Sequence, residues 1–295
     1  MSPLSRRAFL KATLAAGTVA SAGTLPLHAT TSKATDIVTL GKSGLKVTRL
    51  AFGTGSQNGH VQSSLGQKEF TRLVHYAYDR GIRFFETAES YSTPAMLGEA
   101  LKAFPRESYQ LMHKVTTDEG VDPMKRFDEM RRIAQAEYFD IMLLHWQHTS
   151  DWTATTRRWQ DGVLEAQAKK IIRTRGASVH GLPALRQVPG NTWLEVAMIR
   201  MNHNGVRMDG PDYRTDDHNP EYRDEVVEHV KKVKSEGMGV ISMKLVGDGA
   251  FIRHEDRQAA MRFAFKNAGI DCATVGFKNT QEIDEAIDNM NLALS

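Results

Sequence analysis

The chain has 295 residues, of which 25% are charged and 41% hydrophobic, and these proportions exclude a disordered chain, a collagen-like chain and a protein with several membrane spans. Its 38 Lys and Arg residues exceed its 35 Asp and Glu residues by three, and residues 1–29 hold three basic residues and no acidic one. The remainder is therefore neutral, which argues against a nucleic-acid partner, because such proteins carry a basic surface for the phosphate backbone.

The first 29 residues have the composition of an export signal. Arg6 and Arg7 precede a weakly hydrophobic run over 12–22, which is too short to span a bilayer as a stable helix. This order resembles a twin-arginine signal, whose translocase carries folded proteins. It predicts a cleaved signal peptide over 1–29, the twin-arginine translocase as a partner during export, and a periplasmic protein without a stable membrane span after cleavage. The alternative is an ordinary N-terminus in which the two arginines are adjacent by accident.

Residues 30–35 form a predicted spacer, and a single domain is expected over 36–295. Two extended segments, 37–40 and 45–48, flank a short stretch that begins and ends with glycine. Glycines at a turn between two extended segments are typical of a β-hairpin. The domain is therefore expected to begin with a hairpin.

The hairpin is followed by short apolar runs that alternate with helical segments. The eight runs span 50–52, 82–85, 109–113, 141–144, 171–175, 196–201, 239–243 and 272–275. The eight helical segments span 68–80, 94–102, 122–136, 153–169, 182–188, 223–236, 256–267 and 280–294. Strands buried on both faces read as continuous apolar runs, so we predict an α/β fold, a (β/α)8 TIM barrel with an N-terminal β-hairpin. The alternative, a doubly wound open sheet, is disfavoured because no glycine-rich fingerprint follows the first run.

Four reactive side chains stand at the ends of neighbouring predicted strands, where the active sites of such barrels lie. They are Glu86 and Tyr91 after the second strand, Lys114 after the third and His145 after the fourth. A tyrosine hydroxyl is a poor acid or base near neutral pH until a cation such as Lys114 favours its anion. Glu86 can hold the lysine charged, and His145 can orient the oxygen that exchanges a proton with Tyr91. The alternative is a structural ion pair beside two ordinary rim residues.

Several motifs occur in order over most of the chain. They are GLKVTRLAFGT at 44–54, GIRFFETAESY at 81–91, LGEAL at 97–101, YFDIMLLHW at 138–146 and GFKN at 276–279. Through them the sequence resembles the aldo-keto reductases from about residue 40 to 289. The resemblance implies NADPH-dependent reduction of aldehydes or ketones and the reverse oxidation, here of a small polar carbonyl or alcohol. By position it implies Tyr91 as general acid and base, Lys114 and Glu86 as its tuning partners, and His145 as the group that orients the substrate.

The resemblance also implies a site for the cofactor, NADP, with NAD not excluded. The residues at the corresponding positions are Gly53, Thr54, Ser178, Met243 and Lys244 around the nicotinamide, Gly276, Phe277, Lys278 and Asn279 at the adenosine phosphate, and Glu285 at the adenine. Trp146, His180 and Asn204 are expected to line the substrate mouth. Asn204 belongs to a long polar stretch over 202–222, which we interpret as a lid or substrate wall.

The chain departs from the family pattern in the same region. Glu86 stands where the family has aspartate, so its pairing with Lys114 must differ in geometry. Val179 and Met198 replace the asparagine and glutamine that usually hold the carboxamide, Met243 replaces an aromatic ring, and Ala286 replaces an asparagine. An unpaired carboxamide would weaken binding, although methionine can pack against the face of a ring.

The predicted export adds a second constraint on the cofactor. An exported enzyme meets no dependable supply of reduced nicotinamide outside the cytoplasm, whereas a protein carried across in its folded state can take a cofactor with it. The hypothesis is that the cofactor is tightly held and loaded before export, and is recycled on the protein by a second substrate or by transient oxidation of one substrate.

Two other functions stay open. A metal-dependent barrel hydrolase or isomerase would use His145, His148, His180, His203 and Glu86, although strand one lacks a His-x-His pair and strand eight lacks an aspartate, so no metal ligand is assigned. A catalytically inactive barrel that serves as a binding subunit would explain the altered carboxamide pocket.

Overall fold

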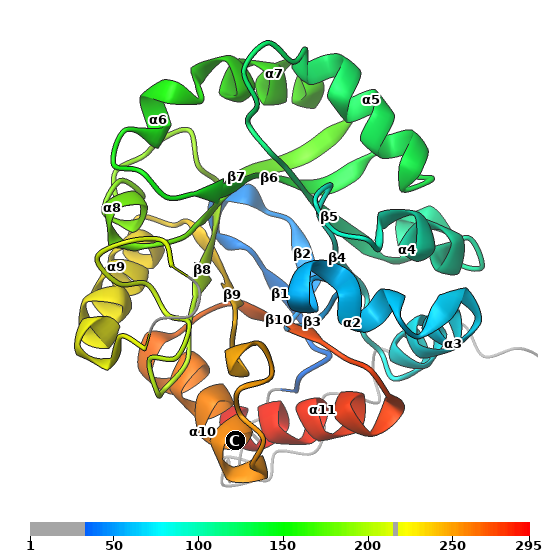
Figure 1. Ribbon diagram of the computed structural model, residues 1–295, viewed down its shortest axis with the longest axis vertical. Coiled ribbons are helices and arrows are strands. Elements are labelled where there is room, and N and C mark those ends of the chain that lie inside the picture. The colour runs from blue at the N-terminus through cyan, green and yellow to red at the C-terminus, as the bar shows by residue number, and fades with distance from the viewer. Residues whose placement is uncertain (1–32, 215–217) are drawn as a thin grey trace, which may run out of the picture. The chain divides into compact units, whose positions relative to one another are not determined.

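The computed structural model describes residues 33–214 and 218–295. Within them, eight parallel strands close into a barrel in the order β10-β3-β4-β5-β6-β7-β8-β9 (Figure 1). The strands are β3 (Leu50–Gly53), β4 (Phe84–Glu86), β5 (Gln110–Val115), β6 (Phe139–Gln147), β7 (Ile172–Val179), β8 (Val196–Arg200), β9 (Gly239–Met243) and β10 (Cys272–Gly276). The predicted (β/α)8 barrel is confirmed and the open sheet is wrong. The predicted signal peptide lies outside the described residues.

Helices surround the strands, as Figure 1 shows down the barrel. They are α2 (His60–Ser63), α3 (Gly66–Asp79), α4 (Pro94–Leu101), α5 (Pro123–Ile133), α6 (Trp152–Thr155), α7 (Arg157–Ala168), α8 (Leu182–Leu185), α9 (Arg223–Ser235), α10 (His254–Arg262) and α11 (Thr280–Leu294). Short 3₁₀ turns span Gly41–Ser43, Ser56–Gly59, Arg106–Ser108, Pro220–Tyr222 and Gly247–Gly249, and a π-helical turn spans Phe263–Ala268. In the described part of the chain, no helix is long and apolar enough to cross a membrane.

Side chains that alternate along each strand fill two separate cores, because successive residues of a strand point to opposite faces. The inner core lies inside the barrel and includes Met112, Leu143 and Met198. The outer core lies between the strands and the helices and includes Phe85 and Phe139. On β5 the alternation puts His113 beside Phe139, with ring centroids 4.8 Å apart, and Lys114 beside Glu86 at the mouth. This burial on both faces explains the continuous apolar runs of the sequence.

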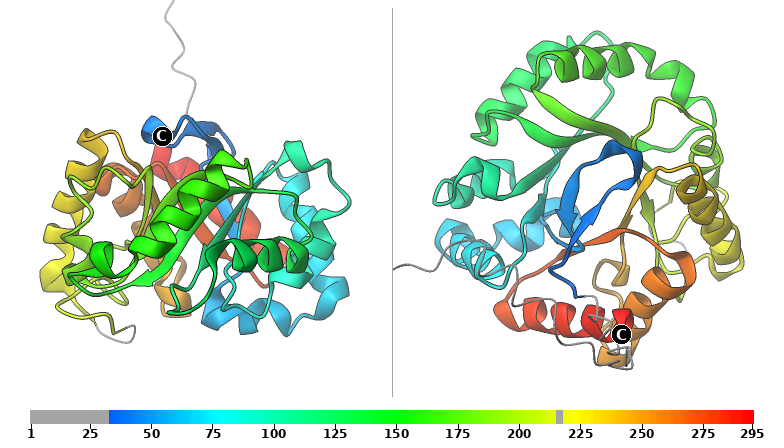
Figure 2. Two further views of the ribbon diagram at one scale, coloured as in Figure 1. Left: turned by 90° about the horizontal axis from the view of Figure 1, so that it is seen from above. Right: turned by 180° about the vertical axis from the view of Figure 1, so that it is seen from behind.

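The N-terminal hairpin closes the end of the barrel opposite to the mouth. Its strands β1 (Ile37–Thr39) and β2 (Lys46–Thr48) pair antiparallel, and Leu40 and Val47 join the inner core. Gly41 has a positive φ of 50°, and a side chain there would collide with the backbone just before β9. Figure 2 shows the hairpin in blue at the top of the left view, with α2 at the other end of the barrel.

The bounds of several helices differ from the prediction; the segment expected over 182–188, for example, is helical only over Leu182–Leu185. The helix expected over 153–169 is interrupted at Thr156, whose hydroxyl donates to the Trp152 carbonyl at 2.7 Å, and it becomes α6 and α7. This local hydrogen bond competes with the regular helix. The helix expected over 256–267 begins at His254 and ends in the π-helical turn, with Gly269 in the left-handed conformation after it. Helix α2 has no counterpart among the predicted elements.

Candidate active site

Three side chains meet at the mouth of the barrel above β4 and β5. Lys114 Nζ contacts Glu86 Oε1 and lies 3.2 Å from the Tyr91 hydroxyl and 3.2 Å from the Thr87 carbonyl oxygen. Lys114 and Glu86 are 1% and 2% exposed, so each is the other's principal compensation for lost hydration. The additional methylene shifts the carboxylate relative to that of an aspartate, and the carboxylate still contacts the lysine.

The Tyr91 ring is held by the loop after β3. A side chain at Gly55 would place its Cβ 2.5 Å from the ring carbons of Tyr91, so this glycine lets the ring approach the backbone. Lys114 Nζ also lies 4.6 Å from the centroid of the ring. The phenol is thus fixed between a backbone and an ammonium group.

His145 completes this group from β6. Its ring meets the Tyr91 ring edge-on, with centroids 5.8 Å apart, and its Nδ1 lies 3.4 Å from the Ser90 hydroxyl. A register shift between Leu144 and Gln147 interrupts the pairing of β6 with β7 at this point. Bulges of this kind re-aim side chains next to active sites. The next residue, Trp146, has a positive φ of 56°.

The electrostatics of this group favour a neutral imidazole and a protonated phenol. Burial raises the pKa of Tyr91, and the negative charge of Asp248 raises it further. Burial lowers the pKa of His145 well below its usual value, and the charge of Lys114 adds to the shift. Burial also lowers the pKa of Lys114, whereas the Glu86 carboxylate in contact with it acts in the opposite direction.

A second polar group lies at the ends of β7 and β8. The Ser178 hydroxyl lies 3.0 Å from His180 Nε2 and 4.0 Å from the Met243 sulfur. Arg200 Nη2 donates to His180 Nδ1 at 2.7 Å. The His180 ring lies 6.3 Å from the His145 ring, centroid to centroid, so this group borders the catalytic one.

The loop after β9 reaches over the same mouth. Lys244 and Asp248 both have positive φ angles, 55° and 54°, and Lys244 Nζ lies 3.0 Å from Asp248 Oδ2. Arg207 Nη1 lies 3.5 Å from the same oxygen. Asp248 acts on the pKa of Tyr91, and Lys244 lowers the pKa values of Lys114, His145 and His180, which places the pair within electrostatic range of the catalytic group.

The ends of β3 and β10 lie side by side, with Gly53 and Gly276 paired in register. A Cβ at Gly53 would lie 2.6 Å from Thr274 Cγ2, and one at Gly276 would collide with the Ser56 hydroxyl. Gln62 Nε2, on α2, donates to Ser56 Oγ at 3.1 Å and to the Phe277 carbonyl oxygen at 3.3 Å.

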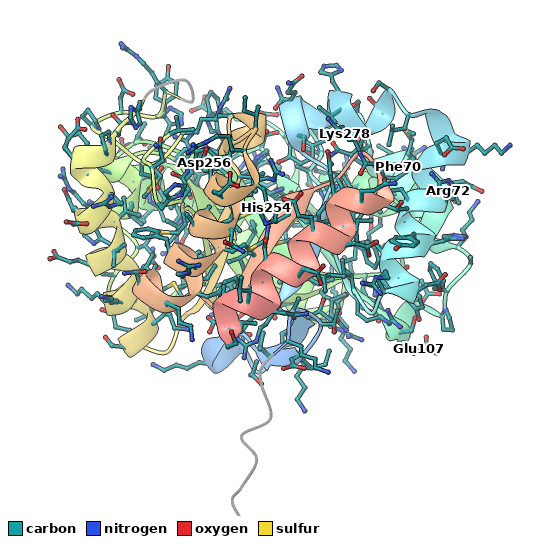
Figure 3. The ribbon with its side chains drawn as sticks, turned by 90° about the horizontal axis from the view of Figure 1, so that it is seen from below. Phe70, Arg72, Glu107, His254, Asp256 and Lys278 are labelled. Atoms are coloured by element: carbon teal, nitrogen blue, oxygen red, sulfur yellow. The ribbon has the colours of Figure 1, made fainter. Side chains whose placement is uncertain are left out.

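Helix α11 begins beside this pair of strand ends. Figure 3 shows Lys278 near its first turn, with α10 and His254 on one side and α3 with Phe70 on the other. Lys278 is exposed, whereas Asn279 caps the helix by accepting a hydrogen bond from the Glu282 amide at 2.9 Å. Phe277 packs into the outer core against Phe52.

Exposed rings form the rim beside His145. Trp146 and Tyr213 are each 44% exposed, and their rings meet edge-on with centroids 5.5 Å apart. His148 lies between them, 4.9 Å from Trp146 and 4.5 Å from Tyr213. Asn204 lies in the neighbouring loop, where its backbone N–H donates to Asn202 Oδ1 at 3.1 Å and its backbone carbonyl accepts from His218 Nε2.

A family model described as the aldo/keto reductase family matches residues 49–262. The chain belongs to this family. The match includes the three strands that carry Glu86, Lys114 and His145 and ends before α11.

Curated relatives match parts of the chain. A protein named probable aldo-keto reductase 1 from Glycine max is 36% identical over 80 residues, which cover 26% of this chain and 23% of that one. The methylglyoxal reductase DkgA of Salmonella typhimurium is 30% identical over 153 residues, 46% of this chain and 53% of the relative. The chain thus spans about half or less of the length of these relatives.

Solved structures match more of the chain and show the fold. An aldo-keto reductase from Klebsiella pneumoniae in complex with NADPH has a TM-score of 0.67 at 15% identity, with 90% of this chain and 92% of that chain covered. A Bombyx mori aldo-keto reductase in complex with NADP has a TM-score of 0.63 at 17% identity, with 88% and 92% covered.

The residues present fit the cofactor that the family implies, although not at every predicted position. Lys278 is exposed two residues before α11, and its ammonium, which lies 3.5 Å from Glu282 in the first turn, has the charge to bind a phosphate. The Ser178 hydroxyl can form a hydrogen bond with the carboxamide of the nicotinamide. Glu285 is engaged by Arg257, at 2.5 and 2.9 Å, and Asn279 by its own helix, so both have structural partners in this family member.

The sequence did not indicate several polar residues at the mouth. Arg200 and Asp209 are fully buried behind His180, Gln62 lies over Gly276, and Tyr213 joins the rim. An arginine inside an otherwise apolar strand, Val196–Arg200, is the one signal that could have indicated the first of them. In residues 33–214 and 218–295, no cluster of three or more His, Cys, Asp or Glu side chains is arranged to hold a metal ion.

Proposed function

We propose that this protein reduces a small polar carbonyl compound, or oxidises the corresponding alcohol, with NADP as cofactor and Tyr91 as general acid and base. The observation that carries this proposal is the 3.2 Å approach of Lys114 Nζ to the Tyr91 hydroxyl, with Glu86 in contact with the same ammonium. The family membership supports the class of reaction.

In the reductive direction, Tyr91 gives its proton to the oxygen of the substrate carbonyl. A phenol is protonated at neutral pH, and burial raises the pKa of Tyr91 further, so its proton is transferred only when the resulting phenolate is stabilised. Lys114 stabilises the phenolate that remains, and Glu86 keeps Lys114 charged. His145, neutral because its pKa is lowered, orients the oxygen through a hydrogen bond.

NADP(H), when bound, supplies or accepts the hydride. On this chain, Lys278 and the first turn of α11 would hold its adenosine phosphate, and Ser178 its carboxamide. Met198 and Met243, which belong to the inner core and lie beside Ser178, offer an apolar wall to the ring. Gly53 and Gly276 are paired in register at the ends of β3 and β10, where close neighbours leave no room for a side chain.

We also propose that the protein is exported through the twin-arginine pathway to the periplasm and that it keeps its cofactor tightly bound. Arg6 and Arg7 and the run after them support the export, and the loop over Lys244–Asp248 at the mouth supports slow release. The test is to express the full chain, purify the exported form by gel filtration and identify the molecule released on denaturation. Stoichiometric NADP supports retention, whereas an empty protein whose turnover requires added NADPH contradicts it.

The reaction is tested by following NADPH absorbance with a panel of small aldehydes, ketones and hydroxylated carbonyls. Methylglyoxal belongs in the panel because the Salmonella relative is named as its reductase. The proposal predicts turnover with at least one compound. Absence of both NADPH binding and turnover would reject it.

The competing function is a catalytically inactive barrel that binds a partner. The observation in its favour is that Ser56 and Gln62 already fill the space beside Gly276, close to the predicted site of the adenosine phosphate. NADPH titration separates the two functions, since the inactive barrel would not bind it.

A further inference from the structure

The carboxamide end of the proposed cofactor site contains an unusual hydrogen-bond chain. Val179 and Met198 occupy the positions where the resemblance places an asparagine and a glutamine. Neither has a side-chain amide that could hydrogen-bond a carboxamide. Ser178, directly before Val179 and paired in register with Met198, is retained and is fully buried. His180 and Arg200 follow it in a line, with donor–acceptor distances of 3.0 and 2.7 Å.

The direction of each hydrogen bond in this chain is fixed by chemistry. A guanidinium has only donors, so Arg200 Nη2 donates and His180 Nδ1 accepts. The His180 ring is neutral, because burial and then the charge of Arg200 hold its pKa well below the usual value. A neutral ring that accepts at Nδ1 carries its proton on Nε2. His180 therefore donates to Ser178 Oγ.

This direction determines what Ser178 can do. One lone pair of its oxygen is occupied by His180, and its own hydrogen remains to be donated. The Met243 sulfur, 4.0 Å away, is a weak acceptor. A carbonyl oxygen at the mouth would be a much better partner for this hydrogen.

Arg200 is itself held in place. Its guanidinium donates to the carbonyl oxygens of Tyr213 and Arg214, each at 3.2 Å, and its Nε lies 3.7 Å from Asp209 Oδ1. Asp209 accepts from the Gly181 amide at 2.7 Å, directly after His180. Arg200 and Asp209 are both fully buried. Because a buried ion pair contributes little net stability, we interpret this pair as a device that fixes the conformation of the Arg200 side chain.

We propose that Arg200 and His180 are positioning residues that make Ser178 a hydrogen-bond donor to the carboxamide oxygen, in place of the two missing amides. This inference rests on the proposed function, because it requires a nicotinamide cofactor. It explains how the carboxamide can be held by one side chain of this protein.

The test measures the dissociation constant (Kd) of NADPH by fluorescence titration of cofactor-free protein. His180→Ala removes the donor to Ser178 and is expected to raise Kd about tenfold, the usual effect of a lost buried hydrogen bond. His180→Gln can still accept from Arg200 and donate to Ser178, so its Kd should stay within about threefold of wild type. His148→Ala, which removes a half-buried imidazole from the rim, is the matched control and should leave Kd unchanged.

A double-mutant cycle separates positioning from general damage. If His180 acts through Ser178, then Ser178→Ala and the double variant S178A/H180A should have the same Kd. The acetylpyridine analogue of NADP, which keeps the carbonyl oxygen but lacks the amide NH₂ group, should bind wild type nearly as well as NADP does. Melting temperatures establish that each variant is folded.

The outcomes are distinct. Wild-type protein that binds no NADPH contradicts the proposed function itself. Wild-type binding that His180→Ala leaves unchanged, or additive losses in the double variant, overturns this inference and leaves the proposed function standing. Strong rejection of the acetylpyridine analogue by wild type would also overturn it, because the amide NH₂ would then be the group recognised.

Discussion

Lys114 Nζ lies 3.2 Å from the hydroxyl oxygen of Tyr91 while it contacts the carboxylate of Glu86. These residues come from β5, from the loop after β4 and from β4 itself. One ammonium thus links the proton donor at the mouth to a carboxylate in the barrel interior. The proton affinity of the phenol depends on this link, because the cation stabilises the phenolate and the carboxylate stabilises the cation.

Tyr91→Phe removes the proton donor and should lower kcat by about 10²- to 10⁴-fold, the usual contribution of a general acid. The Kd of NADPH and the melting temperature should change little, since only one hydroxyl is lost. Steady-state kinetics and fluorescence titration measure these quantities. Tyr213→Phe removes a hydroxyl from the rim and serves as the control. Full activity of Tyr91→Phe would exclude Tyr91 as the acid.

Glu86→Gln leaves the buried ammonium of Lys114 without its carboxylate. Breaking one side of a buried ion pair should destabilise the fold by about 3–5 kcal/mol. Urea unfolding followed by circular dichroism measures the loss. Glu69→Gln removes the carboxylate of an exposed pair with Arg72 and should cost less than about 1 kcal/mol. Equal losses in the two variants would show that Lys114 is compensated by other groups.

His113 predicts a dependence of stability on pH. Burial lowers the pKa of its imidazole to about 4. Between this value and the unfolded value of about 6.5 the unfolded chain binds the proton and the folded chain does not, so stability falls as the pH falls. From pH 7 to pH 5 the loss from this residue is about 2 kcal/mol.

His113→Leu removes that contribution. Its free energy of unfolding should therefore change less between pH 7 and pH 5 than that of wild type, by about 2 kcal/mol. Urea unfolding at the two pH values gives the comparison. An unchanged pH dependence in His113→Leu would indicate that the buried ring is not neutral in the fold.

Gly55→Ala tests how closely Tyr91 is held. The added Cβ would lie 2.5 Å from the ring, so the phenol must move away from Lys114, and kcat should fall at least tenfold. The backbone φ of Gly55, −101°, allows alanine, so the fold should persist. Gly190→Ala places a Cβ in open space but at a positive φ, so it should lower stability by about 1 kcal/mol and leave kcat unchanged. Wild-type kcat for Gly55→Ala would contradict the described packing.

The fold could be predicted because its physics is local and periodic. Each strand, buried on both faces, leaves a continuous apolar run, and each amphipathic helix follows within a short loop. Boundaries were less certain where a side chain competes with the backbone, as Thr156 does between α6 and α7. Helix α2 was missed because its four residues carry no amphipathic repeat.

The catalytic group could be predicted as a set because its members stand at strand ends, which a barrel brings together. The residues behind His180 could not. Arg200 sits inside an apolar strand and Asp209 in a long polar loop, and only the folded chain brings the two within 3.7 Å. Gln62 was missed for the same reason, since its partner Phe277 lies 215 residues away in the sequence. Whether each residue performs its predicted role stays a prediction for the experiments above.

The left-handed backbone at Trp146 affects how this protein would respond to selection. A non-glycine residue at a φ of 56° costs about 1 kcal/mol, and glycine would relieve that cost while removing an exposed ring beside His145. Selection for thermal stability alone would therefore favour loss of the tryptophan. Retention of tryptophan at position 146 in orthologues from warm habitats would therefore indicate that this exposed ring contributes to the function of the rim.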